Sequence, residues 1–145
     1  IEKDSFCDTA TYGLQEDGKI SVLNYAKLDK PTADGTDYTI GGYAYVPDAT
    51  KPGELKVHFD AGSAAPPVDA PYWVLALGPV NSAGQYDWAI VSDNLSQFLF
   101  VLARDVDTFN SEYDSTVLET LKSLQFTGYK KPLKIYQGTD CVYNK

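Results

Sequence analysis

Apolar and polar residues alternate with a period of two through most of this chain, in short segments separated by turn-forming residues. This pattern predicts half-buried β-strands. Asp17-Gly18 is a strong hairpin signal, and Gly41-Gly42 inside a strand predicts a bulge or a close backbone approach. We expect strands at residues 10–14, 19–28, 38–46, 54–59, 72–77, 86–91, 98–103 and 133–137. Regular spacing of short strands favours a closed antiparallel barrel, with a β-sandwich as the alternative.

One segment, residues 111–125, departs from this alternation and predicts a single late helix. Ser111 and Asp114 resemble an N-terminal capping pattern, and Gly128 is the predicted stop. The apolar residues at helical spacing are Tyr113, Val117, Leu118, Leu121 and Leu124. The chain of 145 residues is long enough to bury a core, so we expect one domain over residues 1–145.

The only two cysteines, Cys7 and Cys141, stand near the two ends of the sequence. They allow one disulfide, which would constrain the unfolded chain by about 4–5 kcal/mol on the loop-entropy model. The alternative is a pair of buried free thiols in a cytosolic protein. Asn94-Leu95-Ser96 is an N-glycosylation sequon, which makes Asn94 the candidate glycosylation site. With no signal peptide and no initiator Met, the sequence favours a processed, secreted product.

Charge, hydropathy and motif content argue against nucleic-acid binding, a membrane helix, a metal site and a phosphate-binding loop. Twelve Lys and Arg against twenty Asp and Glu give a net charge of −8, whereas nucleic acid requires a basic surface. No apolar run approaches the roughly 20 residues that a membrane helix needs. We find no metal-ligand spacing and no phosphate-binding loop.

His58, the only histidine, bears on catalysis. It lies between Val57 and Phe59 in a predicted strand, so its side chain points to the opposite face from theirs. If those two residues face an interior, His58 faces out, which argues against a Ser-His-Asp site and against haem ligation. Cys7 is the only other candidate nucleophile, and a disulfide would consume it. The sequence therefore predicts that the protein is not an enzyme.

Several segments, in order, resemble those of one known family. They are Cys7-Asp8-Thr9-Ala10-Thr11-Tyr12, Gly18-Lys19-Ile20-Ser21-Val22-Leu23-Asn24, Gly53-Glu54-Leu55-Lys56-Val57-His58-Phe59, Ala70-Pro71-Tyr72-Trp73-Val74-Leu75-Ala76 and Val101-Leu102-Ala103-Arg104, with Cys141 last. The chain resembles the lipocalins, most of all the group with apolipoprotein D, the insect bilin-binding proteins and the crustacyanins. The resemblance implies an eight-stranded antiparallel up-and-down β-barrel with one C-terminal α-helix. It also implies a Cys7–Cys141 disulfide.

The chain departs from the lipocalin pattern in two places. The family's first strand, which carries a Gly-x-Trp motif, has no counterpart here. Either an N-terminal piece was cleaved and remains as a separate chain, or the sequence given is incomplete, and in both cases we expect an N-terminal fragment to supply the missing strand. In the family, the Arg that matches Arg104 packs over that Trp, and we expect the same role here. The family's Thr-Asp-Tyr turn after Ala76 is replaced by Leu77-Gly78-Pro79-Val80-Asn81, which changes the expected hairpin geometry.

Strand alternation and the family's phase together predict an apolar, aromatic interior with a few polar groups, which is the composition of a small-molecule site. Gly42, Ala44, Ala76 and Ala89 are small, which favours a cavity over a filled core. The predicted ligand-binding residues are Tyr12, Ile20, Val22, Asn24, Ile40, Val57, Phe59, Tyr72, Val74, Val91, Phe98, Phe100 and Leu102.

These features predict an extracellular carrier of one small hydrophobic molecule. The ligand is either a pigment, meaning a bilin or a carotenoid that would stack on aromatic walls, or a colourless lipid or steroid. A lipid-modifying enzyme on the same fold is the alternative from another class. The apolar, Pro-rich loop at residues 61–70 is a candidate subunit contact in a homo- or hetero-oligomer, or else an ordinary loop at the barrel mouth.

Overall fold

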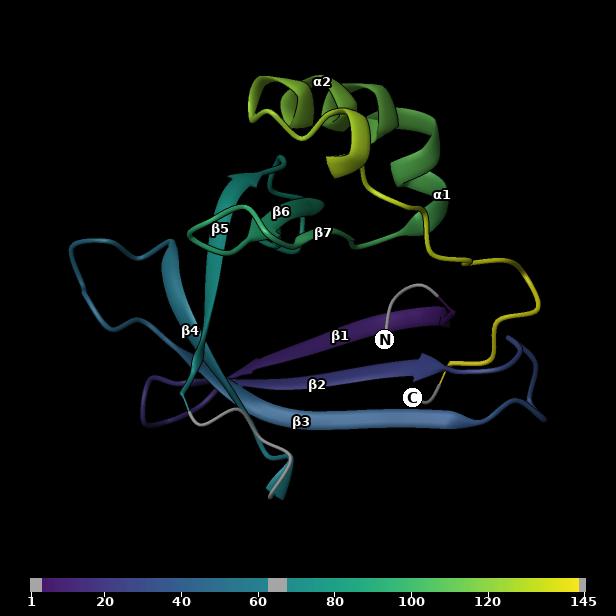
Figure 1. Cartoon of the computed structure of the whole chain (residues 1–145), viewed down its shortest axis with the longest axis horizontal. Helices are drawn as coiled ribbons and strands as arrows, with labels where there is room; N and C mark the ends of the chain where they lie inside the picture. The colour runs from purple at the N-terminus through teal and green to yellow at the C-terminus, as the bar shows by residue number, and fades with distance from the viewer. Residues whose placement is uncertain (1–3, 63–67, 144–145) are drawn as a thin grey trace. The chain divides into compact units, whose positions relative to one another are not determined.

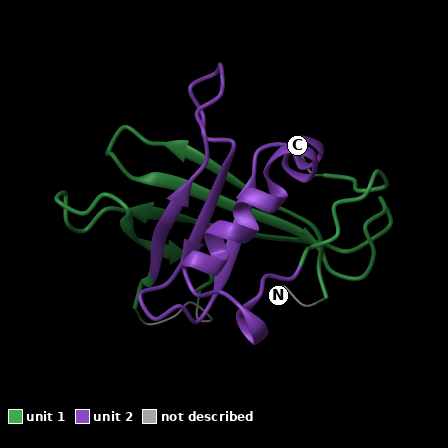
Figure 2. Cartoon of the chain, turned by 90° about the horizontal axis from the view of Figure 1, so that it is seen from above, with its two compact units in different colours: residues 1–70, 134–145 green, residues 71–133 purple. Residues whose placement is uncertain are grey.

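The computed structural model describes residues 4–62 and 68–143, and the chain divides into two compact units (Figure 2). Unit 1 comprises residues 1–70 and 134–145, and unit 2 comprises residues 71–133. The described residues hold seven strands, all paired antiparallel, and one long helical segment near the C-terminus. The all-β class predicted from the sequence is confirmed.

Unit 1 is an antiparallel meander of four strands that follow one another along the chain (Figure 1). They are β1 (Phe6–Leu14), β2 (Ile20–Lys27), β3 (Asp37–Tyr45) and β4 (Glu54–Phe59). The β1–β2 hairpin closes at Gly18, whose positive φ of 83° is accessible to glycine without strain. The hairpin predicted from Asp17-Gly18 is therefore present.

Gly42 lies where the backbones of β3 and β4 approach most closely. A Cβ on Gly42 would come within 2.0 Å of the His58 carbonyl oxygen, whereas a Cβ on Gly41 would meet nothing nearer than 3.8 Å. The close approach predicted from Gly41-Gly42 is thus confirmed for Gly42.

The C-terminal segment of unit 1 packs beside β1 and is held by a disulfide. The Sγ atoms of Cys7 and Cys141 are 2.01 Å apart, across a sequence separation of 134 residues. Phe6 and Tyr136 form an isolated parallel bridge, and their rings meet edge to face at 6.0 Å. The strand predicted at residues 133–137 is wrong, because only this single bridge forms there.

Unit 2 contains three antiparallel strands, β5 (Ala70–Leu77), β6 (Trp88–Ser92) and β7 (Leu99–Ala103), followed by helices. A register shift between Val74 and Ala76 marks a β-bulge in β5. The helical segment runs through α1 (Val106–Thr108), a π-helical turn η2 (Phe109–Tyr113) and α2 (Asp114–Ser123). A short 3₁₀ turn, η3 (Gly128–Lys130), follows.

The helical segment begins and ends at signals other than those predicted. It begins after Asp105, whose carboxylate accepts a 2.8 Å hydrogen bond from the Thr108 amide, so Ser111 is not the cap. It ends at Gln125, which adopts a left-handed φ of 68°, while the Phe126 amide donates to the Leu121 carbonyl. This is a Schellman arrangement with Gln125 in the position that usually holds glycine. Gly128, the predicted stop, instead opens η3 with a φ of 62°.

The core of unit 2 lies between the helices and one face of its strands. Phe126, just beyond the helix, is buried with them because the Schellman turn directs the chain back onto the sheet. The buried members are Trp88, Ile90, Val117, Leu121 and Phe126. Among the described residues, no helix combines the length and the apolar character that crossing a bilayer requires.

Candidate functional site

The strand register of unit 1 places the predicted ligand-binding residues of that unit on one face of its sheet, because directly paired residues share a face. Tyr12 is paired with Val22, and Asn24 with Ile40. Gly42 lies opposite both Val22 and Phe59, and Ala44 opposite both Ile20 and Val57. We call this set the unit 1 apolar face: Tyr12, Ile20, Val22, Asn24, Ile40, Gly42, Ala44, Val57 and Phe59.

Most side chains of the unit 1 apolar face are hydrophobic, and those at its centre are small. Val22, Ala44 and Val57 are each at most 5% exposed. Gly42 and Ala44 in β3 are the small members, and both lie opposite larger side chains of β2 and β4.

Asn24 is the polar residue that stands out on this face. Its side chain is half-buried, and within the described part of the chain it forms no hydrogen bond with another residue. An amide in such surroundings offers two donors and an acceptor to a bound molecule. Tyr12 and Tyr72, the other polar residues in the prediction, already interact with neighbouring groups.

The opposite face of β3 and β4 carries a polar aromatic cluster that the sequence reasoning missed. The rings of Tyr43 and His58 stack at 5.0 Å, and the Lys19 ammonium lies 4.3 Å from the centre of the Tyr43 ring. His58 Nδ1 is 2.9 Å from the Asp69 carboxylate, to which the Tyr45 hydroxyl donates at 2.6 Å.

These contacts fix the electrostatics of the cluster. The Tyr45 hydroxyl and then His58 lower the pKa of Asp69, because both favour the ionised carboxylate. The strand register places His58 on the face opposite to Val57 and Phe59, as predicted, and the contact with Asp69 holds that residue against the face of β4 that carries His58. Alternation alone could place His58 on this face, but the Asp69 contact spans a loop and leaves no local signal.

A second feature that sequence reasoning missed is the buried ammonium of Lys27, whose side chain is only 3% exposed. It lies 2.6 Å from the Asp37 carboxylate and donates to the Gly35 carbonyl at 2.9 Å. Hydrogen bonding to Asp37 raises the pKa of Lys27, and Lys27 in turn lowers the pKa of Asp37. The Tyr25 hydroxyl lies 2.8 Å from Asp37 and 3.0 Å from the Val142 carbonyl, and burial raises its pKa. This network joins β2 and β3 to the C-terminal segment and is structural in character.

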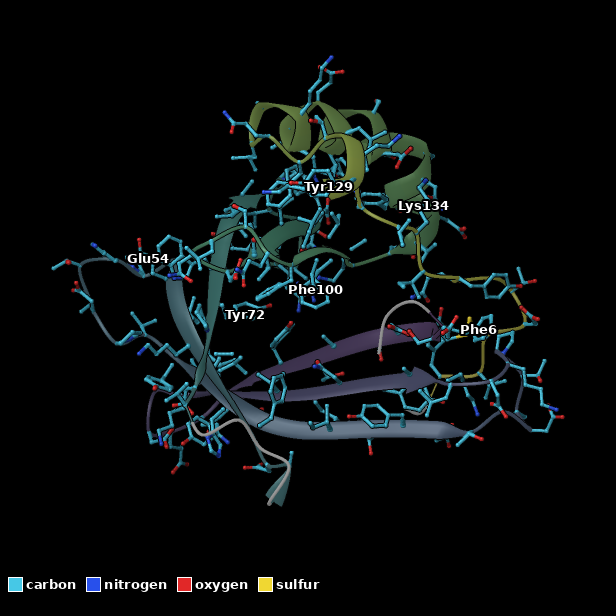
Figure 3. All side chains as sticks on the ribbon, viewed as in Figure 1. Phe6, Glu54, Tyr72, Phe100, Tyr129 and Lys134 are labelled. Atoms are coloured by element: carbon cyan, nitrogen blue, oxygen red, sulfur yellow. A yellow bond between two sulfur atoms is a disulfide. The ribbon has the colours of Figure 1, made fainter. Side chains whose placement is uncertain are left out.

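Unit 2 has a corresponding apolar face on the side of its strands away from the helices. Val91 is paired with both Val74 and Phe100, and Ala89 with Leu102. Tyr72 shares the face of Val74 by strand alternation. Phe98 precedes the first residue of β7, but its ring lies 5.4 Å from that of Phe100. Figure 3 labels Tyr72 on β5 and Phe100 on β7.

The β-bulge changes the phase at the end of β5. Ala76 is paired with Ile90 and packs against the helix-covered core, so the prediction that Ala76 faces the interior with Val74 is wrong. The extra residue at the bulge reverses the alternation after Val74. The thirteen predicted ligand-binding residues are unaffected, and their contact with a ligand stays a prediction.

Other predicted positions have simpler surroundings. The Arg104 side chain is exposed, and its Nε donates to the Tyr86 carbonyl at 3.2 Å. Asn94 is exposed in the turn between β6 and β7. Of the loop at residues 61–70, residues 63–67 lie outside the described residues.

Metal binding and thiol catalysis require clustered donor groups or a free thiol. The described residues contain no group of three His, Cys, Asp or Glu side chains suited to a metal ion. A shallow, open depression on α2 is lined by Ser115, Thr116, Glu119, Thr120 and Ser123, and it lies outside the predicted ligand-binding residues. Both cysteines are in the disulfide, so no thiol is free.

Comparisons with known proteins bear on this geometry. A family model described as a lipocalin-like domain matches residues 1–134. Apolipoprotein D of Macaca fascicularis is 34% identical over 119 residues, which is 81% of this chain and 56% of that protein. Apolipoprotein D of Mus musculus is 34% identical over 104 residues, 68% of this chain and 49% of that protein. The chain thus spans about half the length of these curated relatives. With the antiparallel strands and the single late helical segment, these matches show that the chain belongs to the lipocalin family.

Proposed function

We propose that this protein carries a small hydrophobic molecule bound by the apolar faces of its strands. The observation that carries the proposal is the unit 1 apolar face, where Asn24 is an unpaired amide among apolar and small side chains. Unit 2 presents a second apolar face with the aromatic rings of Phe98 and Phe100 side by side. Apolar walls with few orienting polar groups are typical of small-molecule sites.

The direct test is to identify what the purified protein carries. Organic extraction followed by mass spectrometry detects a bound lipid or steroid. Displacement of a dansyl-labelled fatty acid, followed by fluorescence, measures whether the emptied protein binds an apolar probe. A carrier releases a defined small molecule or binds the probe with saturation. Empty extracts together with no saturable probe binding would contradict the proposal.

We further propose that the ligand is a conjugated pigment, either a bilin or a carotenoid. Support comes from the aromatic members of the predicted set, since Tyr72, Phe98 and Phe100 offer ring faces to a flat conjugated molecule. The absorption spectrum of the purified protein decides between the alternatives. Visible bands that disappear on extraction indicate a pigment, whereas a colourless extract that contains lipid indicates a lipid or steroid carrier.

A lipid-modifying enzyme is the second candidate, and we propose that the protein is not one. Two observations weigh against an enzyme: Cys7 is bonded to Cys141, and His58 lies on the face opposite to the apolar residues. Incubation with lipid substrates, analysed for product by mass spectrometry, tests this directly. Turnover that survives alkylation of any reduced thiol would require a different nucleophile.

We also propose an extracellular setting with a glycan on Asn94. The disulfide agrees with an oxidising compartment, and the sequon lies in an exposed turn that a glycosyltransferase can reach. Removal of N-glycans by a glycosidase should lower the mass of protein secreted from eukaryotic cells. Asn94→Gln should abolish that shift, while Asn81→Gln, outside any sequon, should not.

A strand partner for β1 completes the proposal. Within unit 1, the described residues pair one edge of β1 with β2, and along the other edge they show the bridge to Tyr136 and one hydrogen bond from the Gln137 side chain to the Asp8 carbonyl, but no paired strand. An unpaired edge is a template for another strand, so we propose that an N-terminal fragment or a second subunit pairs there. Intact-mass analysis of the native protein detects a bound fragment, and light scattering detects an oligomer. A monomer without a fragment would contradict the proposal.

A further inference from the structure

The positive charges of this acidic chain are unevenly distributed. Residues 120–139 contain four of the twelve Lys and Arg residues and no Asp or Glu. The other 125 residues carry eight Lys and Arg against all twenty carboxylates. A locally basic segment on a protein with a net charge of −8 attracts anionic partners through that segment alone, because the rest of the surface repels them.

The fold presents part of this segment to solvent on a fixed turn. Phe126 is buried in the core of unit 2 and anchors the chain directly after the Schellman turn. Gly128 then opens η3, closed by hydrogen bonds from the Lys130 amide to Thr127 and from the Lys131 amide to Gly128. Tyr129, within η3, is 95% exposed (labelled in Figure 3), and Leu133 is 75% exposed.

The lysines beside these exposed side chains are not neutralised within the protein. Lys122, Lys130 and Lys131 form no ion pair in the described ranges 4–62 and 68–143. Lys134 already interacts with another group of the protein and is left out of the argument. We define the basic turn as Lys122, Tyr129, Lys130, Lys131 and Leu133. It thus combines uncompensated positive charge with two large side chains that water surrounds.

We propose that the basic turn docks this protein on the surface of anionic lipid bilayers. The charge attracts acidic headgroups, at about 1 kcal/mol per Lys near the surface. Tyrosine is enriched at the interface between headgroups and acyl chains, and insertion of Leu133 among the acyl chains adds apolar burial. A purely anionic polymer would use the lysines but would gain little from Tyr129 and Leu133. This docking goes beyond the carrier function and does not depend on it, because the basic turn lies outside the predicted ligand-binding residues.

The test is co-sedimentation of the purified full chain with vesicles. Vesicles of phosphatidylcholine with phosphatidylserine should retain the protein at low salt, vesicles of phosphatidylcholine alone should not, and added salt should release it. Lys130→Gln/Lys131→Gln should weaken binding to the anionic vesicles by roughly tenfold or more, from about 1 kcal/mol per Lys. Tyr129→Ala should also weaken binding without any change of charge.

The matched control is Lys51→Gln/Lys56→Gln, which removes the same charge from exposed lysines on and before β4. It should leave vesicle binding unchanged, and circular dichroism should show all variants folded. Failure of the wild-type protein to bind anionic vesicles overturns the proposal, as does an equal loss in both double variants, which would indicate a net-charge effect. Retention on heparin that is insensitive to Tyr129→Ala, without vesicle binding, would reassign the turn to a polyanion. The ligand content and the probe affinity of the protein are measured separately, so none of these outcomes decides whether it is a carrier.

Discussion

The Tyr113 hydroxyl donates a 2.6 Å hydrogen bond to the Asp87 carboxylate, 26 residues earlier in the chain. Asp87 immediately precedes β6, and Tyr113 ends the π-helical turn. The bond therefore joins the helical segment to the sheet of unit 2 beside the apolar core. The Asp87 carboxylate raises the pKa of Tyr113 to about 12 because it disfavours a second negative charge.

Tyr113→Phe should remove a contribution to the free energy of unfolding that is lost at alkaline pH. The pKa of Tyr113 is higher in the folded state than its ordinary value of 10.0, so the contribution is fully present below pH 10 and is lost as pH rises toward 12. Urea unfolding followed by tryptophan fluorescence at a series of pH values measures it. The wild-type advantage over Tyr113→Phe should be constant below pH 10 and shrink above it. Tyr129→Phe, at a 95% exposed position, is the control. An advantage that grew above pH 10 would contradict the assignment.

Gly42→Ala should destabilise the protein, whereas Gly41→Ala should be nearly neutral. A Cβ at Gly42 would lie 2.0 Å from the His58 carbonyl oxygen, so β3 and β4 must separate locally, but at Gly41 the nearest atom is 3.8 Å away. Overpacking of this kind costs about 1–3 kcal/mol, against about 0.5 kcal/mol or less for the control. Urea denaturation of both variants gives the comparison. Equal stabilities would show that the strands adapt without strain.

Gln125→Gly should stabilise unit 2 by about 1 kcal/mol, since left-handed backbone costs a residue with a Cβ about that much. Gln125 holds a φ of 68° as the residue that ends the helix. Gln125→Ala keeps a Cβ and should change stability little, which separates the backbone effect from the loss of a side chain. Thermal unfolding monitored by circular dichroism measures all three proteins. If Gln125→Gly were less stable than the wild type, the added conformational entropy of the unfolded chain would outweigh the relief of backbone strain at residue 125.

Reduction of the Cys7–Cys141 disulfide should lower the free energy of unfolding by about 5 kcal/mol on the loop-entropy model. The bond closes a loop across a separation of 134 residues. The double variant Cys7→Ala/Cys141→Ala reports the same loss without a reducing agent, and urea unfolding measures both. If reduced and oxidised proteins unfolded at the same denaturant concentration, the C-terminal segment would be held by its other contacts alone, such as the Tyr25–Val142 hydrogen bond.

Ligand binding should depend on Tyr72 and Phe100 and not on exposed aromatic residues elsewhere. We expect Tyr72→Ala and Phe100→Ala to weaken probe or ligand affinity by roughly tenfold or more, as loss of a buried ring removes about 1.5–3 kcal/mol of burial. Tyr86→Ala, in the β5–β6 hairpin and 46% exposed, is the matched control. Titration of a dansyl-labelled fatty acid gives the affinities. Unchanged affinity in both test variants would refute the assigned face.

The strands could be predicted from the alternation of apolar and polar residues, because the two faces of each strand differ in polarity. The register of β2, β3 and β4 agrees with the face assigned to Val22, Gly42 and Val57 from the sequence. The face of Ala76 was predicted wrongly because the bulge in β5 inserts one residue, and no glycine or proline in the sequence indicates a bulge there. Contacts between distant segments, such as His58 with Asp69 or Lys27 with Asp37, depend on tertiary placement and leave no periodic trace.

The helix limits were missed for a local reason. Ser111 and Gly128 are residue types that commonly cap helices, yet Asp105 and Gln125 occupy the capping positions. Burial of Phe126 against Leu121 and Val117 outweighs the backbone preference at Gln125 and fixes where the helix must end. The segment at residues 133–137 has strand-like alternation, but it meets β1 at a single bridge because the disulfide and the Gln137 side chain hold it there.

Because unit 1 is completed by residues 134–145, its first four strands are synthesised long before their last partner segment. Cys7 leaves the ribosome as an unpaired thiol and must wait until the whole of unit 2 has followed before Cys141 arrives. Throughout that interval it is open to mixed disulfides with other thiols. The Cys7–Cys141 disulfide can therefore form only after the entire helical region has been translated.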